Sequence, residues 1–177
     1  MALNLVNLDL STRSFMLEEI VHDIAGGKLY YSPRLSSVGT PLYPELLRNA
    51  VRTGTDDSLA NELRVPGRLK VTEERRKPKG GTTTAKVPVN APETLAEGEF
   101  NRFYARGLCL RAIKEGINEL VVYRAKEVAN PRPESTALIG KRLPAKQLLD
   151  DLRASIGTDT ALGLPPGPNS GLSVKFP

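Results

Sequence analysis

The sequence predicts an α+β protein with a compact body of helices and short strands, an extended basic arm and a C-terminal tail rich in proline and glycine. Three observations support this prediction. Apolar residues recur at helical spacing in two separate parts of the chain, 1–64 and 93–156, with few strand-like runs. The segment between them, 65–92, is basic and interrupted by Pro and Gly. The last 21 residues, 157–177, hold four Gly and four Pro.

The N-terminal part of the body is expected to be helical. Apolar residues at helical spacing predict an amphipathic helix over 12–25, which a Gly-Gly pair ends. A short strand is predicted over 28–31. Pro44 is well placed as the first residue of a second helix, 44–53, and a third helix is predicted over 57–63, so that the two form a tight helical pair.

The second part of the body carries the strongest helical pattern in the chain. A broad face of aromatic, aliphatic and small residues predicts a long helix over 97–115. Gly107 within it costs up to about 1 kcal/mol relative to Ala, so we expect it to allow the close approach of another backbone. Strands are predicted over 119–128 and 136–139, and a last helix over 144–154.

The positive charge of the chain lies almost entirely in the arm. The formal net charge is +5. The stretch from Arg64 to Lys86 holds eight basic and two acidic residues, a charge of +6, which leaves −1 for the remainder. A long segment without helix or strand is usually functional or ordered by a partner. The arm therefore marks where the protein contacts something acidic, and its candidate contact residues are Arg75, Arg76, Lys77 and Lys79.

Two further candidate contact residues lie on the long helix. Arg102 and Arg106 are four residues apart, so they share a helix face and repel each other unless an anion compensates. Glu99 can pair with Arg102, which leaves Arg106 without a local acid. The functional interpretation is that these arginines contact phosphate or an acidic partner chain. The alternative is a salt bridge from Arg106 to an acid elsewhere in the body.

The sequence lacks the common signatures of catalytic and metal sites. A single Cys (Cys109) and a single His (His22) exclude an internal disulfide, a Cys-rich zinc site and a three-His metal site within the chain. The Glu19-x-x-His22 spacing suits a di-iron site only if another chain supplies the rest. Gly140-Lys141 lacks the remainder of a phosphate-binding loop. We therefore assign no catalytic, cofactor or metal residue and expect a protein that is not an enzyme.

No membrane association is expected. The longest apolar run, 120–123, is far shorter than a membrane span. The N-terminus has no basic region ahead of its apolar residues, so it is unlike a secretory signal. These features predict an intracellular soluble protein.

Three blocks of sequence carry a resemblance to known proteins: GEFNRFYARGLCLRAI over 98–113, VVYRAKEV over 121–128 and PRPESTALIG over 131–140. They resemble a family of small bacterial and prophage-encoded proteins of unassigned activity, and the resemblance covers most of the chain. It implies a component of a virion or particle, located in the cytoplasm of a bacterial host or in the virion. It attaches to no catalytic motif, and we transfer no functional residue from it.

The arm and tail together predict a non-enzymatic structural or interaction subunit. Such segments cannot bury surface against themselves and gain order by lying on a neighbour. We expect a homo-oligomer or an assembly with other subunits, in which the tail ends as a strand added to another sheet. The alternative is a nucleic-acid-associated accessory protein whose arm binds phosphates without sequence specificity, since the arm has no aromatic residue for stacking.

Overall fold

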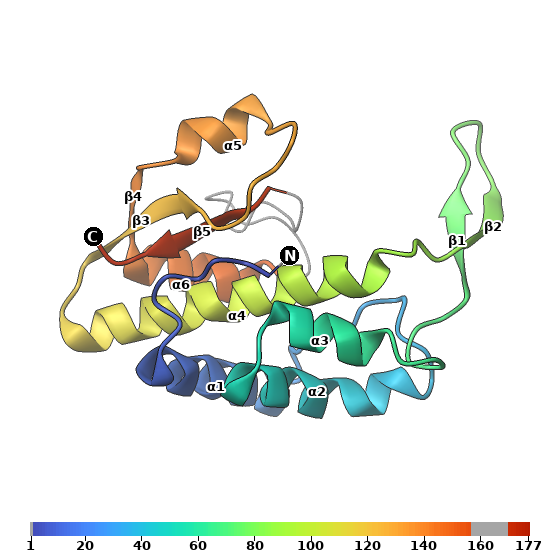
Figure 1. Ribbon diagram of the computed structural model, residues 1–177, viewed down its shortest axis with the longest axis horizontal. Coiled ribbons are helices and arrows are strands. Elements are labelled where there is room, and N and C mark those ends of the chain that lie inside the picture. Colours follow the sequence, from blue (N-terminus) through green and yellow to red (C-terminus); the bar gives the residue numbers. More distant parts are fainter. Residues whose placement is uncertain (1, 157–169) are drawn as a thin grey trace.

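Helix α4 (Ala91–Glu115) is the element around which the rest of the chain packs (Figure 1). The computed structural model describes residues 2–156 and 170–177. These residues form α1 (Leu10–Ala25), α2 (Gly39–Thr53), α3 (Asp56–Leu63), β1 (Thr72–Arg76), β2 (Thr82–Lys86), α4, β3 (Glu119–Arg124), α5 (Pro133–Leu138), β4 (Arg142–Pro144), α6 (Ala145–Ala154) and β5 (Leu172–Lys175). The predicted α+β class is confirmed.

Other helices and a small sheet pack against α4 from two sides. Helices α1, α2 and α3 lie on one side of it, and α6 and a three-stranded sheet lie on the other (Figure 1). As a result, residues 99–109 of α4 are all buried. A helix buried around its whole circumference has no face in contact with water. The charged residues in this stretch must therefore find partners inside the protein.

Two helices begin earlier than their apolar pattern indicates. Helix α2 was predicted from Pro44 but begins at Gly39, because the Ser36 hydroxyl accepts the N–H groups of Val38 and Gly39 at 3.1 and 2.9 Å. Helix α4 was predicted from residue 97 but begins at Ala91, with Pro92 in its first turn.

Gly107 allows the close helix approach that the sequence predicts. A Cβ atom at this position would lie 2.7 Å from Met16 Cγ and 2.8 Å from Met16 N. Because one of these neighbours is backbone, α1 and α4 can be this close only with glycine at the crossing. The prediction of a close backbone approach at Gly107 is confirmed.

The three-stranded sheet has the order β4-β3-β5, and both outer strands run antiparallel to β3. Its registers place Leu120 opposite Leu143 and Val122 opposite Val174. The strand predicted over 136–139 is wrong, because the chain forms α5 there and returns to the sheet only at β4. The strand predicted over 119–128 ends at Arg124.

The predicted strand over 28–31 is also wrong. This segment is a loop that pairs with no strand of residues 2–156 or 170–177, and it buries Leu29 against the core. Its apolar residues fill the core, and a short apolar run that does this cannot be told from a strand by its sequence alone.

The C-terminal residues join the protein's own sheet. Strand β5 pairs with β3 of the same chain, and Leu172 and Val174 are fully buried. The expectation that the tail adds a strand to another sheet is therefore corrected for Leu172–Lys175, whose partner strand is supplied within the chain. The rest of the tail, 157–169, lies outside the described residues.

Candidate functional site

The basic segment folds as a β-hairpin and not as an extended arm. Strands β1 and β2 pair antiparallel from Thr72↔Lys86 to Arg76↔Thr82. The turn is closed by the Lys77 N–H, which donates to Gly81 O at 3.0 Å, and Gly80 and Gly81 both take positive φ, 90° and 78°. We call residues 72–86 the basic hairpin. It stands away from the helices at one end of the molecule (Figure 1).

The basic hairpin has no core of its own. Eight of its ten strand residues are exposed, and only Glu73 and Ala85 are half-buried. A two-stranded hairpin without an apolar face is marginally stable by itself. Contacts at its base, or with a partner, are therefore needed to hold it in place.

The base of the hairpin is attached to the loop before α2. The Arg34 Nε donates to Glu73 Oε2 at 2.6 Å, and the Lys70 N–H donates to Arg34 O at 2.9 Å. Hydrogen bonds from Arg34 and then Arg75 lower the pKa of Glu73, so this carboxylate stays charged. The attachment fixes the direction of the hairpin and leaves its tip free.

The structure divides the predicted basic contact residues into paired and unpaired ones. Arg75 is an ion-pair partner of Glu73, with 2.6 Å between Nη2 and Oε1. Within residues 2–156 and 170–177, Arg76, Lys77 and Lys79 make no ion pair, and all three are exposed. We call Arg76, Lys77 and Lys79 the tip cations. Of the predicted contact residues, these three carry the charges that are available to an acidic partner.

Of the other basic residues near the hairpin, two arginines have acidic partners in the body, whereas Lys70 donates to Pro33 O and Lys86 is exposed without an ion pair among the described residues. Arg64 pairs with Glu93, and Arg68 pairs with Glu62. Their charges help to hold the base of the hairpin. The sequence count of +6 therefore overstates the charge that faces solvent.

Arg102 and Arg106 lie in the interior, where no external anion can reach them. Their exposed fractions are 7% and 0%. Arg102 donates to Ser155 O at 2.6 Å and lies 3.4 Å from Glu99. For these two residues the predicted contact with phosphate or an acidic partner chain is wrong, because helices on both sides of α4 enclose them.

Arg106 forms a salt bridge with acids elsewhere in the body, which was the alternative to an external contact. Its guanidinium donates to Asp23 on α1 through both Nη atoms and to Glu19 through Nε at 2.8 Å. Glu19 also accepts from Arg153 Nε on α6 at 3.0 Å. Burial raises the pKa of Glu19, but the two arginines outweigh it and lower that pKa. The cluster therefore joins α1, α4 and α6 through charged hydrogen bonds.

Among the described residues, the buried Cys109 and Glu19 are not arranged as reactive groups. Cys109 is buried, and burial raises the pKa of its thiol, which disfavours the reactive thiolate. Glu19 is occupied by two arginines, so it is not presented with His22 as a ligand pair. Within the two described ranges, no group of three His, Cys, Asp or Glu side chains could hold a metal ion.

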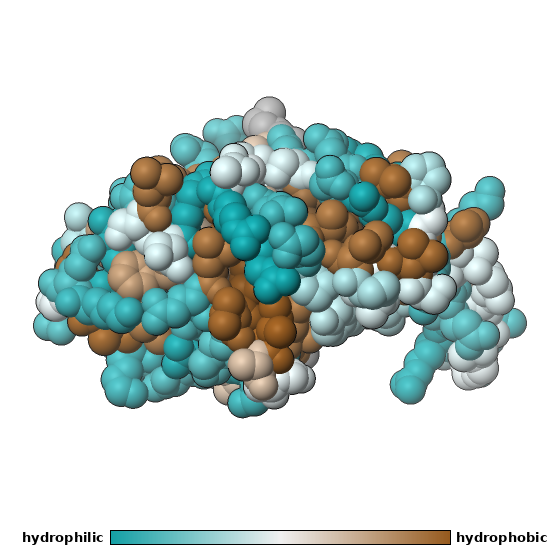
Figure 2. All heavy atoms as spheres, turned by 90° about the horizontal axis from the view of Figure 1, so that it is seen from below, coloured by the Kyte–Doolittle hydropathy of each residue, from teal (hydrophilic) through white to brown (hydrophobic). Residues whose placement is uncertain are grey.

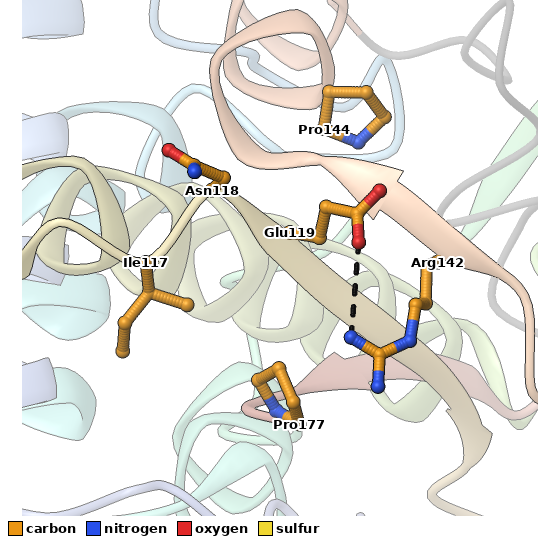
Figure 3. A pocket seen from close by; sticks show the side chains of 6 residues that line it. All are labelled: Ile117, Asn118, Glu119, Arg142, Pro144 and Pro177. Atoms are coloured by element: carbon orange, nitrogen blue, oxygen red, sulfur yellow. Dashed lines mark ion pairs between the residues drawn. The ribbon is translucent and has the colours of Figure 1, made fainter.

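A shallow pocket of about 520 Å³ lies beside β3 and β4 (Figure 3). The ion pair between Glu119 and Arg142 spans part of it, with 3.7 Å between Oε2 and Nη1, and both side chains are largely exposed. The lining residues are Ile117, Asn118, Glu119, Arg142, Pro144 and Pro177. None of these is a usual nucleophile or a histidine, so the pocket does not form a recognisable catalytic constellation.

An apolar patch lies on the face formed by α1 and α2 (Figure 2). The exposed apolar residues of α1 and of the start of α2 include Leu10 at 85%, Val21 at 54% and Leu42 at 43%. Patches of this kind can mark contact surfaces. Nothing in the structure shows what covers this one.

Across the described part of the chain, none of the helices combines the length and the apolar character that crossing a bilayer requires. The basic hairpin thus remains the surface whose charge and exposure most clearly call for a partner. Comparisons with protein families, with curated proteins and with solved structures found no match for this chain.

Proposed function

We propose that this protein is a non-enzymatic subunit of a larger assembly, a virion or another oligomeric particle, and that the basic hairpin contacts an acidic surface of a neighbouring subunit. The observation that carries the proposal is an exposed hairpin with three tip cations that have no acid partner in the described residues. A hairpin of this kind gains little by folding alone, so its structure is best explained by what it binds.

Charge, and not apolar burial, would drive this contact. The strands of the hairpin expose Thr, Glu, Arg and Lys side chains. Complementary charge steers association and selects the partner, and exposed charges are screened by salt. Binding through the tip cations should therefore be strongest at low ionic strength.

A nucleic-acid-associated accessory protein is the second candidate, because the same cations could neutralise phosphates. Residues 72–86 contain no aromatic side chain on which a base could stack. Binding by this route would be non-specific. Neutralising about three phosphates would give a salt slope of about −2.7 on duplex DNA.

The test compares binding before and after removal of the tip cations. The variant changes Arg76, Lys77 and Lys79 to Ala, and a matched control changes the exposed Lys28, Lys141 and Lys146 to Ala. Both variants lose three positive charges. Fluorescence anisotropy would measure binding of a polyglutamate peptide and of a short duplex DNA at low and high salt.

We expect polyglutamate to bind the wild type and the control, and to bind the tip variant at least tenfold more weakly. An equal loss in both variants would mean that only net charge matters and would contradict the proposal. Preference for DNA over polyglutamate, lost in the tip variant alone, would favour the second candidate. Absence of binding to both probes at low salt would exclude both candidates.

A further inference from the structure

The two outer edges of the basic hairpin differ in chemistry. Strand β1 carries four charged residues in succession, 73–76, whereas β2 is uncharged from Thr82 to Ala85. Native proteins protect exposed sheet edges with charges, prolines or bulges, because an open edge can pair with another strand. The edge of β2 lacks charge along most of its length, and its three threonines suit a strand.

The backbone bonds at the two ends of the hairpin show which groups of β2 point outward. Lys77 N–H donates to Gly81 O, and Val87 N–H donates to Val71 O at 2.9 Å. Residues in an antiparallel pair alternate between facing the partner strand and facing away. The N–H and C=O groups of Thr82, Thr84 and Lys86 therefore face away from β1. Within the described residues, no third strand lies beside them.

We propose that the β2 edge pairs with β2 of a second copy of this chain. The two strands would run antiparallel about a two-fold axis at Thr84, which gives a four-stranded sheet in the order β1-β2-β2-β1. This inference rests on the proposed function, since it names one partner of the assembly. It uses the edge of the hairpin and leaves the tip cations free for another contact.

The outward groups determine the register. Only residues whose N–H and C=O point outward can exchange hydrogen bonds with the second copy. Centring the pair on Thr84 engages all three, with Thr84 opposite Thr84 and Thr82 opposite Lys86 of the second copy. Pro88 has no N–H, so it ends the usable edge on one side, and the turn ends it on the other.

Charge favours the β2 edge over the β1 edge for a two-fold contact. The outward residues of β1 are Thr72, Glu74 and Arg76, by the same alternation. A two-fold pair centred on β1 would set Glu74 against its own copy, and like charges directly opposite each other are destabilising. At β2 the self-opposed residue is Thr84, and Thr–Thr pairs are favourable.

The arrangement also separates the two basic tips. Because the two β2 strands run antiparallel, the turns of the two hairpins lie at opposite ends of the four-stranded sheet. The tip cations of the two copies would then be kept apart. Sheets of three or more strands are also more stable than an isolated hairpin. Self-association would therefore stabilise the element that is weakest in the monomer.

The first experiment removes one outward N–H group from each edge in turn. Thr84→Pro takes away an outward donor at β2, and Glu74→Pro takes away an outward donor at β1. Neither residue gives its N–H to the hairpin's own ladder, so the two variants are matched. Sedimentation velocity of the full chain would be measured over a concentration series, because an interface of this size is expected to be weak.

We expect a dimer for the wild type and Glu74→Pro, and at least a tenfold weaker dimer for Thr84→Pro. A wild type that stays monomeric up to about 1 mM would overturn the proposal. So would a dimer that Thr84→Pro leaves unchanged. That second result would point to another surface, such as the apolar patch on α1 and α2.

A second experiment tests the two-fold register through charge. Because Thr84 faces its own copy, Thr84→Lys and Thr84→Glu should each weaken the dimer, and mixing the two variants should restore it as a heterodimer. Restoration supports the register, whereas two weakened variants that do not recover on mixing contradict it.

The outcomes separate this inference from the proposed function. The tip variant, with Arg76, Lys77 and Lys79 changed to Ala, should still dimerise. The Thr84→Pro variant should still bind polyglutamate. Loss of dimerisation alone therefore counts against the β2 edge, and loss of anion binding alone counts against the role of the tip cations.

Discussion

Arg106 on α4 and Asp23 on α1 form a bidentate ion pair in the interior of the protein. The Nη1–Oδ2 distance is 2.6 Å, and the Nη2–Oδ1 distance is 2.7 Å. Both side chains are almost completely buried, and the third guanidinium nitrogen, Nε, donates to Glu19. A planar guanidinium suits two carboxylates at once. The pair therefore sets how α1 lies against α4.

Replacing Arg106 should be strongly destabilising. Arg106→Ala leaves Asp23 buried without its partner, and such losses cost about 3–5 kcal/mol. Arg48→Ala, which breaks the exposed pair with Glu45, is the control and should cost less than about 1 kcal/mol. Urea denaturation measures both free energies of unfolding. Equal, small losses in the two variants would show that the interior pair is not structurally important.

A methyl group at Gly107 should force α1 and α4 apart. Gly107→Ala is expected to cost about 1–3 kcal/mol or more, because its Cβ would overlap the Met16 backbone. The double variant with Met16→Ala removes the side-chain overlap and leaves the backbone overlap. A double-mutant cycle by thermal denaturation should therefore show only partial recovery. Full recovery would mean that the side chain, and not the backbone, requires the glycine.

The stability of the protein should fall as the pH rises toward neutrality. Burial is the main cause that raises the pKa of Glu99 to about 7, from 4.5, although Arg102 and Arg106 oppose it. A carboxyl with a raised folded-state pKa stabilises the fold below its unfolded pKa. That contribution is lost as the pH rises from about 4.5 to about 7.

Glu99→Gln isolates this effect, because Gln resembles the protonated carboxyl. The variant should match the wild type near pH 4 and exceed it by about 1–3 kcal/mol near pH 8. Urea denaturation at the two pH values gives the comparison. The opposite trend, a variant that is less stable at pH 8 than at pH 4 relative to the wild type, would show that the ionised carboxylate stabilises the fold.

The basic hairpin should be dispensable for folding of the body. Val87 N–H donates to Val71 O at 2.9 Å, so a two-residue Asn-Gly turn can replace residues 72–86. This replacement removes the partly exposed ion pair between Arg34 and Glu73, and we expect the free energy of unfolding to change by less than about 1 kcal/mol. Circular dichroism and urea denaturation would check this. An unfolded product would mean that the hairpin is part of the core structure.

Sequence patterns located most of the helices but not all of their ends. Helix α1 was predicted from residue 12 and begins at Leu10, where Asp9 accepts the Thr12 N–H at 2.8 Å. Gly116 ends α4 in the left-handed conformation, as a glycine after a helix predicts. The early start of α2 depends on Ser36, which has no position in the apolar pattern.

The two small sheets were harder to predict, because strand pairing depends on distant residues. The run 136–139 looks like a strand but forms α5, and β3 finds its partners at 142–144 and 172–175. The hairpin was expected as an extended arm. Its strands contain no apolar alternation from which pairing could be predicted, and only the Gly-Gly turn marked the reversal.

The sequence by itself determined the fold class, the close approach at Gly107 and the concentration of positive charge between Arg64 and Lys86. These properties follow from composition and local spacing. Only the tertiary structure decided which basic residues are free. Arg102 and Arg106 look like surface charges on a helix, but α4 is enclosed, so they pair inside, while the tip cations remain exposed. The physical reason is that a charged side chain pairs with whichever residues lie near it in space. The residues next to it along the chain do not show which ones these are.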